Sequence, residues 1–250
     1  MKYSKIEWTD ATWNPSTGCN KVTSGCKNCY AETMAKRLQA MGTPGYENGF
    51  EFTIMPDRLE LPKKIKKPTK FFVNSMSDLF HEKMPFDFLD KVFETIEHTP
   101  IHQYQILTKR ENILEDYFRT RKVPKNVWLG VTVENSKTKN RIDALRNIDA
   151  EIRFLSIEPL IGNVGKLNLE NIHWVIVGGE SGHKARPMKP EWAIDIQRQC
   201  DEQGVAFFFK QWGTWGEDGV KRSKKANGRI LLGKEWNEEP EVELIMVVSH

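Results

Sequence analysis

The chain contains 250 residues, of which 39% are hydrophobic and 28% are charged. This composition is too apolar for a disordered protein and too charged for a membrane protein, and no apolar run approaches the roughly 20 residues that a bilayer span requires. The net charge of +3 is too small to indicate a nucleic-acid partner by itself. Because the first residues carry no apolar segment typical of a secretory signal, we expect a cytoplasmic protein that binds no membrane.

Short β-rich runs alternate with helical stretches from about residue 70 onward, a pattern typical of parallel βα units. A further strand is predicted over residues 4–8. About seven such units predict an α/β fold, specifically a partial or irregular TIM-like (β/α) barrel with parallel strands, and leave a doubly wound sheet as the alternative. The other predicted strands are residues 70–74, 104–108, 127–132, 152–156, 174–178 and 205–209.

Helical segments are predicted beside these strands. The last of them begins next to Pro190, and proline favours the first position of a helix. Residues 42–69, rich in Gly and Pro, are expected to form a long loop. We expect residues 1–212 to form the barrel and residues 213–250 to form a polar appendage and not a second domain. The predicted helices are residues 31–41, 86–97, 111–121, 136–147 and 191–203.

Three of the four cysteines lie within eleven residues, as Cys19, Cys26 and Cys29. Clustered thiols in a cytosolic chain indicate a metal site more than a disulfide framework. The stretch from residue 17 to residue 31 is therefore predicted to be a metal-binding loop with the spacing Cys-x6-Cys-x2-Cys. The fourth cysteine, Cys200, is predicted to be an ordinary buried residue.

The ligand set of this loop favours an iron–sulfur cluster. Gly18 and Gly25 let the backbone turn tightly around a central object, and three thiolates suit a [4Fe–4S] cluster whose fourth iron stays open. A structural zinc normally takes four protein ligands, and the first histidine after the loop is His81. A zinc ion completed by a distant residue, and thiols that bind no metal, remain as alternatives.

Polar side chains follow nearly every predicted strand. In parallel barrels the loops after the carboxyl ends of the strands build the active site, so we expect these residues to take part in catalysis or binding. Polar residues that only solubilise loops are the alternative. The predicted catalytic residues are Asp78, Lys109, Glu158 and Lys210, and the predicted cofactor-binding residues are Asn74, Ser77, Thr132, Glu134, Ser156, Gly178, Gly179 and Glu180.

Eight motifs spread over nearly the whole chain resemble the phage Gp37/Gp68 family of uncharacterised proteins, which has no settled reaction. A more distant resemblance is to radical S-adenosylmethionine enzymes, in which three cysteines near the first strand of a partial barrel hold a [4Fe–4S] cluster. The usual spacing there is Cys-x3-Cys-x2-Cys, three residues shorter than in this chain. The eight motifs are residues 8–15, 19–31, 75–80, 107–110, 128–135, 156–160, 177–182 and 208–213.

The resemblance to radical S-adenosylmethionine enzymes implies S-adenosylmethionine as a cofactor and an electron donor as a partner. It also implies that cleavage of a C–S bond of this cofactor gives an adenosyl radical. In many radical enzymes a Gly-Gly-Glu segment after an early strand binds the ammonium group of this cofactor, whereas residues 178–180 follow a late strand. Lys109 and Lys210 suit pairing with a carboxylate or phosphate. Asp78 and His81 suit acid–base work.

The substrate is indicated only by basic and aromatic residues. The basic stretches 63–70 and 221–225, with Trp212 and Trp215, which we expect to be exposed, suit contact with phosphates and stacking on bases. Solvated faces are the alternative for such stretches. We predict a radical S-adenosylmethionine-type enzyme that modifies or repairs DNA, RNA or a nucleotide. A non-catalytic zinc or iron–sulfur protein that binds nucleic acid, and a cluster enzyme that does not use S-adenosylmethionine, are the alternatives.

Overall fold

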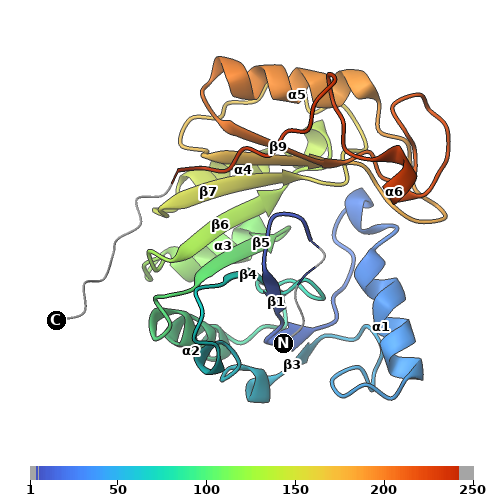
Figure 1. The fold of residues 1–250 in the computed structure, drawn as a ribbon. Helices are drawn as coiled ribbons and strands as arrows, with labels where there is room; N and C mark the ends of the chain where they lie inside the picture. Colours follow the sequence, from blue (N-terminus) through green and yellow to red (C-terminus); the bar gives the residue numbers. More distant parts are fainter. Residues whose placement is uncertain (1–3, 5, 242–250) are drawn as a thin grey trace.

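The computed structural model describes residue 4 and residues 6–241. Its main feature is a sheet of seven parallel strands in the order β1-β4-β5-β6-β7-β8-β9. Strand order follows chain order, and the sheet curls in one direction into a half-barrel (Figure 1). The strands are β1 (Ala11–Trp13), β4 (Lys70–Val73), β5 (Gln103–Thr108), β6 (Val127–Thr132), β7 (Ile152–Ile157), β8 (Trp174–Gly178) and β9 (Ala206–Gln211).

The helices are α1 (Tyr30–Ala40), α2 (Phe86–Glu97), α3 (Glu111–Phe118), α4 (Asn140–Arg146), α5 (Pro190–Glu202) and the short α6 (Lys224–Asn227). Four of them, α2 to α5, connect neighbouring strands and cover the convex face of the sheet (Figure 1). In α2, the buried Leu89, Val92 and Ile96 recur at the spacing of one helix face and share a core cluster with Val73 of β4. α1 instead packs in a small cluster with Met76.

The concave face of the sheet carries an aromatic layer and, beyond it, polar side chains. The aromatic layer forms a core cluster of its own that contains no residue of a helix, and Trp128 and Trp174 meet edge to face within it at 5.7 Å. Side chains alternate between the two faces of a strand, so Thr132 lies on the same face as Trp128, closer to the carboxyl end. The interior is therefore apolar near the amino ends of the strands and polar near their carboxyl ends. The buried members of the aromatic layer are Trp8, Phe72, Trp128, Ile152, Phe154, Trp174, Ile176 and Phe208.

The predicted α/β partial barrel is confirmed. The strand order excludes the doubly wound alternative, in which the order reverses at a switch point. The strands predicted over residues 127–132 and 174–178 and the helix over residues 86–97 have the predicted bounds. The predicted long loop over residues 42–69 also contains β3 (Thr53–Ile54), which pairs antiparallel with β2 (Ser16–Thr17).

The prediction of a first strand over residues 4–8 is wrong. Trp8 enters the aromatic layer, where its ring lies 4.7 Å from that of Phe72, and the chain turns at this point. The first strand, β1, forms later, where Thr12 pairs with Phe72. The apolar residue that suggested a strand therefore fills the half-barrel interior instead.

Two helices are shorter than predicted. α3 ends at Phe118, three residues before the predicted end at residue 121. The helix predicted over residues 136–147 begins as a 3₁₀ turn over Ser136–Thr138, which the side chain of Asn135 caps by accepting a hydrogen bond from Lys137 N. α4 follows this turn as a separate helix.

The segment that follows β9 returns to the sheet. Trp236 O accepts a hydrogen bond from Phe209 N at 3.1 Å, and Glu238 O accepts one from the ring nitrogen of Trp174 at 2.8 Å. The expectation that Trp212 is exposed is wrong: its side chain is buried and donates to Ile230 O at 2.8 Å. The returning segment covers this tryptophan.

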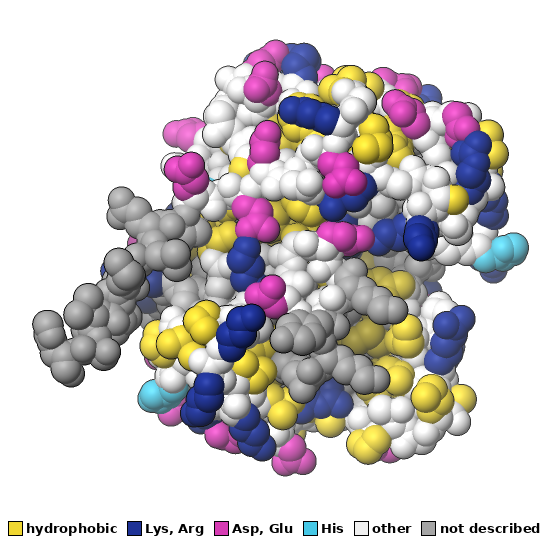
Figure 2. All heavy atoms as spheres, in the orientation of Figure 1, with side chains coloured by type: hydrophobic (Ala, Val, Ile, Leu, Met, Phe, Trp, Pro, Cys, Tyr) yellow, Lys and Arg dark blue, Asp and Glu magenta, His cyan; other side chains and the backbone are white. Residues whose placement is uncertain are grey.

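The surface carries charges of both signs, which are interspersed on the face shown in Figure 2. Several lysines of the basic stretches have acidic partners, such as Lys63 with Glu60 and Lys224 with Glu7. Cys200 of α5 is fully buried, as predicted. No helix in the described part of the chain is long and apolar enough to cross a membrane.

Candidate active site

Residues 17–31, which we call the cysteine loop, cross the carboxyl ends of the strands. Near the start of the loop lies Gly18, whose φ of 74° is in the left-handed region and whose added Cβ would lie 2.1 Å from Glu51 O. Gly18 N donates to Met76 O at 3.0 Å, and Gly18 O accepts from Ser77 Oγ at 2.6 Å. The predicted site residue Ser77 therefore holds the backbone at the start of the loop.

Asp78, which follows β4, contacts the cysteine loop through an arginine. Its buried carboxylate accepts hydrogen bonds from Thr108 Oγ1 at 2.7 Å and from Arg110 Nη1 at 3.1 Å. Arg110 Nη1 also donates to Cys19 Sγ at 3.5 Å, and Arg110 Nη2 donates to Asn20 O at 3.4 Å. Asp78 therefore orients a guanidinium group that binds the loop directly.

Glu134, which follows β6, reaches the cysteine loop without an intermediary. This carboxylate is 0% exposed, accepts a hydrogen bond from Thr23 Oγ1 at 2.8 Å, and lies 3.2 Å from Arg141 Nη1 and 4.0 Å from Lys109 Nζ. A Cβ on Gly25 would lie 2.5 Å from Glu134 Cγ. Glycine is thus needed at this position of the loop for the carboxylate to approach it.

Glu180, which follows β8, binds a third point of the loop. It accepts hydrogen bonds from Asn28 Nδ2 at 3.0 Å and from Arg186 Nε at 2.9 Å, while Arg186 Nη1 donates to Ser24 O at 2.9 Å. Burial alone raises the pKa of Glu180, but the hydrogen bonds from Arg186 and Asn28 outweigh burial and hold this pKa below its usual range. The carboxylate is therefore ionised at neutral pH.

Asp78, Glu134 and Glu180, the three anchoring carboxylates, follow alternate strands of the sheet. Each is at most 6% exposed and each has hydrogen-bond donors from other segments. Buried carboxylates are stable only when such partners satisfy them. The structure therefore brings together one predicted catalytic residue and two predicted cofactor-binding residues as anchors of the cysteine loop.

The three thiols of the loop are free and partly exposed. Burial first, and Asp78 second, raise the pKa of Cys19 to about 11. Nowhere in residues 6–241 are three side chains of His, Cys, Asp or Glu gathered closely enough to hold a metal ion. Three free thiols on one loop nevertheless match the ligand chemistry of an iron–sulfur cluster. Binding would require these side chains to turn toward a common point and lose their protons.

A second polar group occupies the polar end of the half-barrel interior. Lys210 Nζ lies 2.9 and 2.8 Å from the two carboxylate oxygens of Glu158, and Gln211 Nε2 donates to the same carboxylate at 2.7 Å. Burial raises the pKa of Glu158, but the ion pair with Lys210 and the bond from Gln211 lower it below its usual range. Two predicted catalytic residues thus form one ion pair.

The predicted site residues Asn74, Thr132 and Ser156 are all buried. Asn74 adopts a φ of 60° and donates from Nδ2 to Ser16 Oγ at 2.9 Å, which fixes the turn after β4 to β2. Thr132 and Ser156 are register partners on neighbouring strands. The hydroxyl of Thr132 is buried and has no hydrogen-bond partner among the described residues.

The two glycines after β8 fit closely against protein atoms. An added Cβ on Gly179 would lie 1.9 Å from Trp212 O, and one on Gly178 would lie 3.2 Å from both Gln211 Nε2 and the Glu158 carboxyl carbon. Packing alone therefore requires glycine at position 179. Among the described residues, neither glycine forms a backbone hydrogen bond with a cysteine of the loop.

His81 is not arranged as an acid–base partner of Asp78. Its ring stacks on Phe52 with centroids 4.1 Å apart, and its Nδ1 accepts from Lys83 N at 3.1 Å. Burial first, and Arg110 second, lower the pKa of His81 to about 4. The ring is therefore neutral at neutral pH.

The sequence reasoning missed the residues that connect the anchoring carboxylates to the loop. Arg110 lies in the motif 107–110 beside the predicted Lys109, so its position directly after a strand was a usable signal. Arg186 lies in a loop without a recognisable spacing, and Asn28 lies inside the Cys-x2-Cys spacing, which draws attention to the cysteines and not to the residues between them. Their roles depend on contacts across 162 and 152 residues of sequence, which no local pattern encodes.

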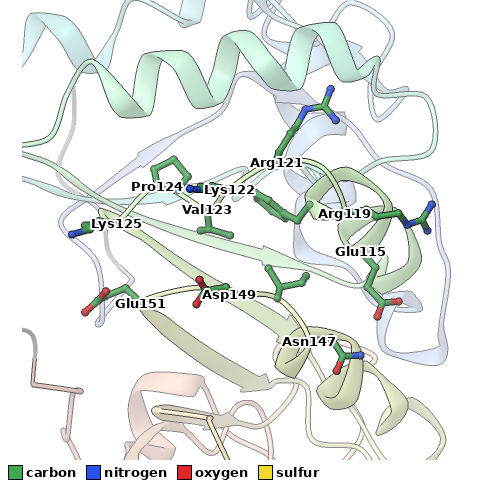
Figure 3. Close-up of a pocket in the computed structure, with 12 residues that line it drawn as sticks. Glu115, Arg119, Arg121, Lys122, Val123, Pro124, Lys125, Asn147, Asp149 and Glu151 are labelled. Atoms are coloured by element: carbon green, nitrogen blue, oxygen red, sulfur yellow. The ribbon is translucent and has the colours of Figure 1, made fainter.

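Two cavities lie at opposite ends of the sheet. One, of about 460 Å³, lies beside the cysteine loop and is lined partly by Thr23, Lys109 and Arg141. The other, of about 810 Å³, lies between the loops that lead into β6 and β7 (Figure 3). Because active sites of parallel barrels form at the carboxyl ends of the strands, the first cavity belongs to the candidate site.

A family model described as "Protein of unknown function (DUF5131)" matches residues 3–240. No curated protein matches the chain. The family description assigns no activity, and the resemblance to the phage Gp37/Gp68 family stays a prediction.

Solved structures of spore photoproduct lyase resemble the chain. A cysteine-to-serine mutant has a TM-score of 0.52 at 13% identity, over 84% of this chain and 79% of that chain. The enzyme complexed with dinucleoside spore photoproduct has a TM-score of 0.47 at 14% identity, over 80% of this chain and 63% of that chain. A mutant with bound AdoMet and dinucleoside spore photoproduct has a TM-score of 0.44 at 13% identity, over 80% of this chain and 64% of that chain. The first likeness shows that the chain shares its overall fold with spore photoproduct lyase.

Proposed function

We propose that this chain, which belongs to the DUF5131 family of proteins of unknown function, is an iron–sulfur-dependent enzyme of the radical S-adenosylmethionine type that acts on nucleic acid or a nucleotide. The observation that carries the proposal is the attachment of the cysteine loop to the half-barrel. Asp78, Glu134 and Glu180 hold the loop over the carboxyl ends of the strands. A loop that served only as a surface connection would not need three buried carboxylates.

Cys19, Cys26 and Cys29 would hold the cluster. Arg110 donates to Cys19 Sγ, and a cationic donor of this kind stabilises a thiolate. Thr23 Oγ1 lies 3.8 Å from Cys26 Sγ while it donates to Glu134. When bound, a [4Fe–4S] cluster supplies the electron that cleaves a C–S bond of S-adenosylmethionine, and an electron donor must reduce it. The protein positions the ligands through these polar contacts.

Glu158 and Lys210 are the side chains best suited to bind the amino-acid end of S-adenosylmethionine. They lie at the polar end of the interior and carry opposite charges in contact with each other. A carboxylate accepts hydrogen bonds from an ammonium group and a lysine pairs with a carboxylate, so the ion pair can exchange its internal contact for two contacts with the ligand. Glu180 is less suited, since Asn28 and Arg186 already occupy it.

The substrate class is supported by the fold likeness to spore photoproduct lyase, three of whose structures hold a dinucleoside spore photoproduct. The cavity of about 460 Å³ beside the cysteine loop, which is lined mainly by polar and charged residues, is consistent with a polar substrate. We therefore assign a nucleotide or nucleic-acid substrate and not a lipid or apolar metabolite.

The test is the cleavage of S-adenosylmethionine by the anaerobically reconstituted, chemically reduced protein. The proposal predicts release of 5′-deoxyadenosine from the wild type and none from Cys26→Ala, with Cys200→Ala as the matched control that retains activity. Glu158→Gln should retain the cluster and lose affinity for S-adenosylmethionine. A reduced cluster that neither binds nor cleaves S-adenosylmethionine would establish the alternative of a cluster enzyme that does not use this cofactor.

A further inference from the structure

We propose that the 460 Å³ cavity beside the cysteine loop binds a phosphate group of the substrate. The inference rests on the proposed nucleic-acid or nucleotide function and adds a location and a chemistry to it. The cavity lies between the cysteine loop, the N-terminus of α3 and the segment that begins α4. Its polar lining, its charge and its uncapped helix end all favour an anion.

The charge of the cavity lining is positive. Four cationic residues and two acidic residues contribute to it. Both acidic side chains already have partners: Glu82 accepts from Asn20 Nδ2 at 2.7 Å, and Glu111 pairs with Arg141 at 3.1 Å. The cationic residues are Lys109, Arg110, Lys137 and Arg141.

Two of the lysines are weakly engaged. Lys109 Nζ has one ion pair in the described structure, with Glu134, at the long distance of 4.0 Å. Lys137 is exposed at the cavity, and within the described residues its side chain has no ion pair. Both side chains are therefore able to turn toward an anion without breaking a strong contact.

The N-terminus of α3 contributes backbone donors. Arg110 is the N-cap residue, and no side chain caps the helix. Within the described residues, the amides of Glu111, Asn112 and Ile113 donate to no acceptor, and all three residues line the cavity. Free amides and the helix dipole together favour a phosphate at such an end.

A buried polar atom independently indicates a missing ligand. Arg110 lines the same cavity, is only 7% exposed, and its Nε has no hydrogen-bond partner in the described chain. Buried donors of this kind are rarely left unpaired in a protein. A phosphate oxygen is an acceptor of the right charge for Arg110, and contact with Nε would require this buried side chain to shift toward the cavity.

The experiment measures binding of phosphate-bearing probes to the metal-free protein by calorimetry. The probes are inorganic phosphate, a 5′-mononucleotide, a dinucleoside monophosphate and the corresponding nucleoside. We expect Lys109→Gln and Lys137→Glu each to weaken binding of a phosphate-bearing probe by about tenfold and to leave nucleoside binding unchanged. Stronger binding of the mononucleotide indicates a terminal phosphate, and stronger binding of the dinucleoside monophosphate indicates an internal phosphodiester.

Lys125→Glu is the matched control for charge. Lys125 is exposed and precedes β6 at its amino end, beside the cavity of Figure 3, whereas Lys137 follows the carboxyl end of the same strand. Equal losses of affinity in Lys137→Glu and Lys125→Glu would show a general charge effect and overturn the proposal. Binding of all phosphate probes no tighter than the nucleoside would also overturn it.

The salt dependence gives a second readout for a short single-stranded oligonucleotide. Removal of one phosphate contact should reduce the slope of log K against log salt by about 0.7, and an unchanged slope in Lys109→Gln contradicts the assignment. Because these measurements need no metal, failure of the phosphate site and failure of the iron–sulfur proposal are distinguishable. A protein that binds phosphate here but carries no cluster would refute only the proposed function.

Discussion

The carboxylate of Glu134 accepts a hydrogen bond from Thr23 Oγ1 at 2.8 Å, across 111 residues of sequence. Glu134 is fully buried at the end of β6, and Thr23 lies between the first two cysteines of the loop. A buried carboxylate loses a stabilising hydrogen bond if the segment that donates it moves away. This contact therefore couples the order of the cysteine loop to the stability of the half-barrel.

Glu134→Gln should uncouple the loop from the sheet. The variant keeps the size of the side chain but removes the charge that faces Arg141 and Lys109. We expect the free energy of unfolding in urea to fall by about 2 kcal/mol, less than for a fully orphaned charge because Arg141 keeps its pair with Glu111. Glu151→Gln, at an exposed position before β7, should change it by less than about 0.5 kcal/mol. Equal effects of the two variants would contradict the coupling.

Arg186→Lys tests the anchor at Glu180. Arg186 uses separate nitrogens to bind the carboxylate and Ser24 O, and lysine cannot reproduce this fork. We expect amide hydrogen exchange to accelerate about tenfold or more over residues 24–28 while the strands keep their protection. Arg198→Lys, on an exposed part of α5, is the control. Unchanged exchange in the loop would show that Arg186 is not an anchor.

The sequence was sufficient to predict the sheet and the polar strand ends, because both depend on local patterns of hydrophobic and polar residues. It was not sufficient to predict which polar residues meet. Asp78 was predicted as a catalytic residue from its place after a strand, and its contacts with Arg110 and Thr108 could not be read from the sequence. Trp212 looked exposed because the following segment is polar, and it is buried because residues near Ile230 fold back over it.

Gly179→Ala should destabilise the protein strongly. The added methyl would lie 1.9 Å from Trp212 O, a backbone atom that cannot move without shifting the chain after β9. We expect a loss of about 3 kcal/mol or more in the free energy of unfolding, as for other overpacked positions. Gly162→Ala, whose methyl would meet Asn135 Cβ at 3.1 Å, should cost less. A tolerated Gly179→Ala would mean that this region of the fold is arranged differently.

The contribution of Glu158 should depend on pH. Lys210 and Gln211 outweigh burial and lower the pKa of Glu158 in the folded state, so its ionised form stabilises the protein above the ordinary carboxyl pKa and loses this effect as the pH falls through the lowered value. The wild type should therefore be more stable than Glu158→Gln at pH 7, and the difference should shrink below about pH 4.5. Urea unfolding of both proteins at pH 7 and below about pH 4.5 measures this difference in the free energy of unfolding. A difference that does not change with pH would contradict a stabilising ion pair between Glu158 and Lys210.

The most direct test of the account is the iron, acid-labile sulfide and zinc content of the anaerobically reconstituted wild type beside Cys26→Ala. The account predicts about four irons and four sulfides per wild-type chain, near-complete loss of both in Cys26→Ala, and unchanged content in the control Cys200→Ala. Circular dichroism of the variants checks that the half-barrel remains folded. Stoichiometric zinc without labile sulfide in the wild type, or full iron content in a folded Cys26→Ala, would contradict the assignment of the cysteine loop.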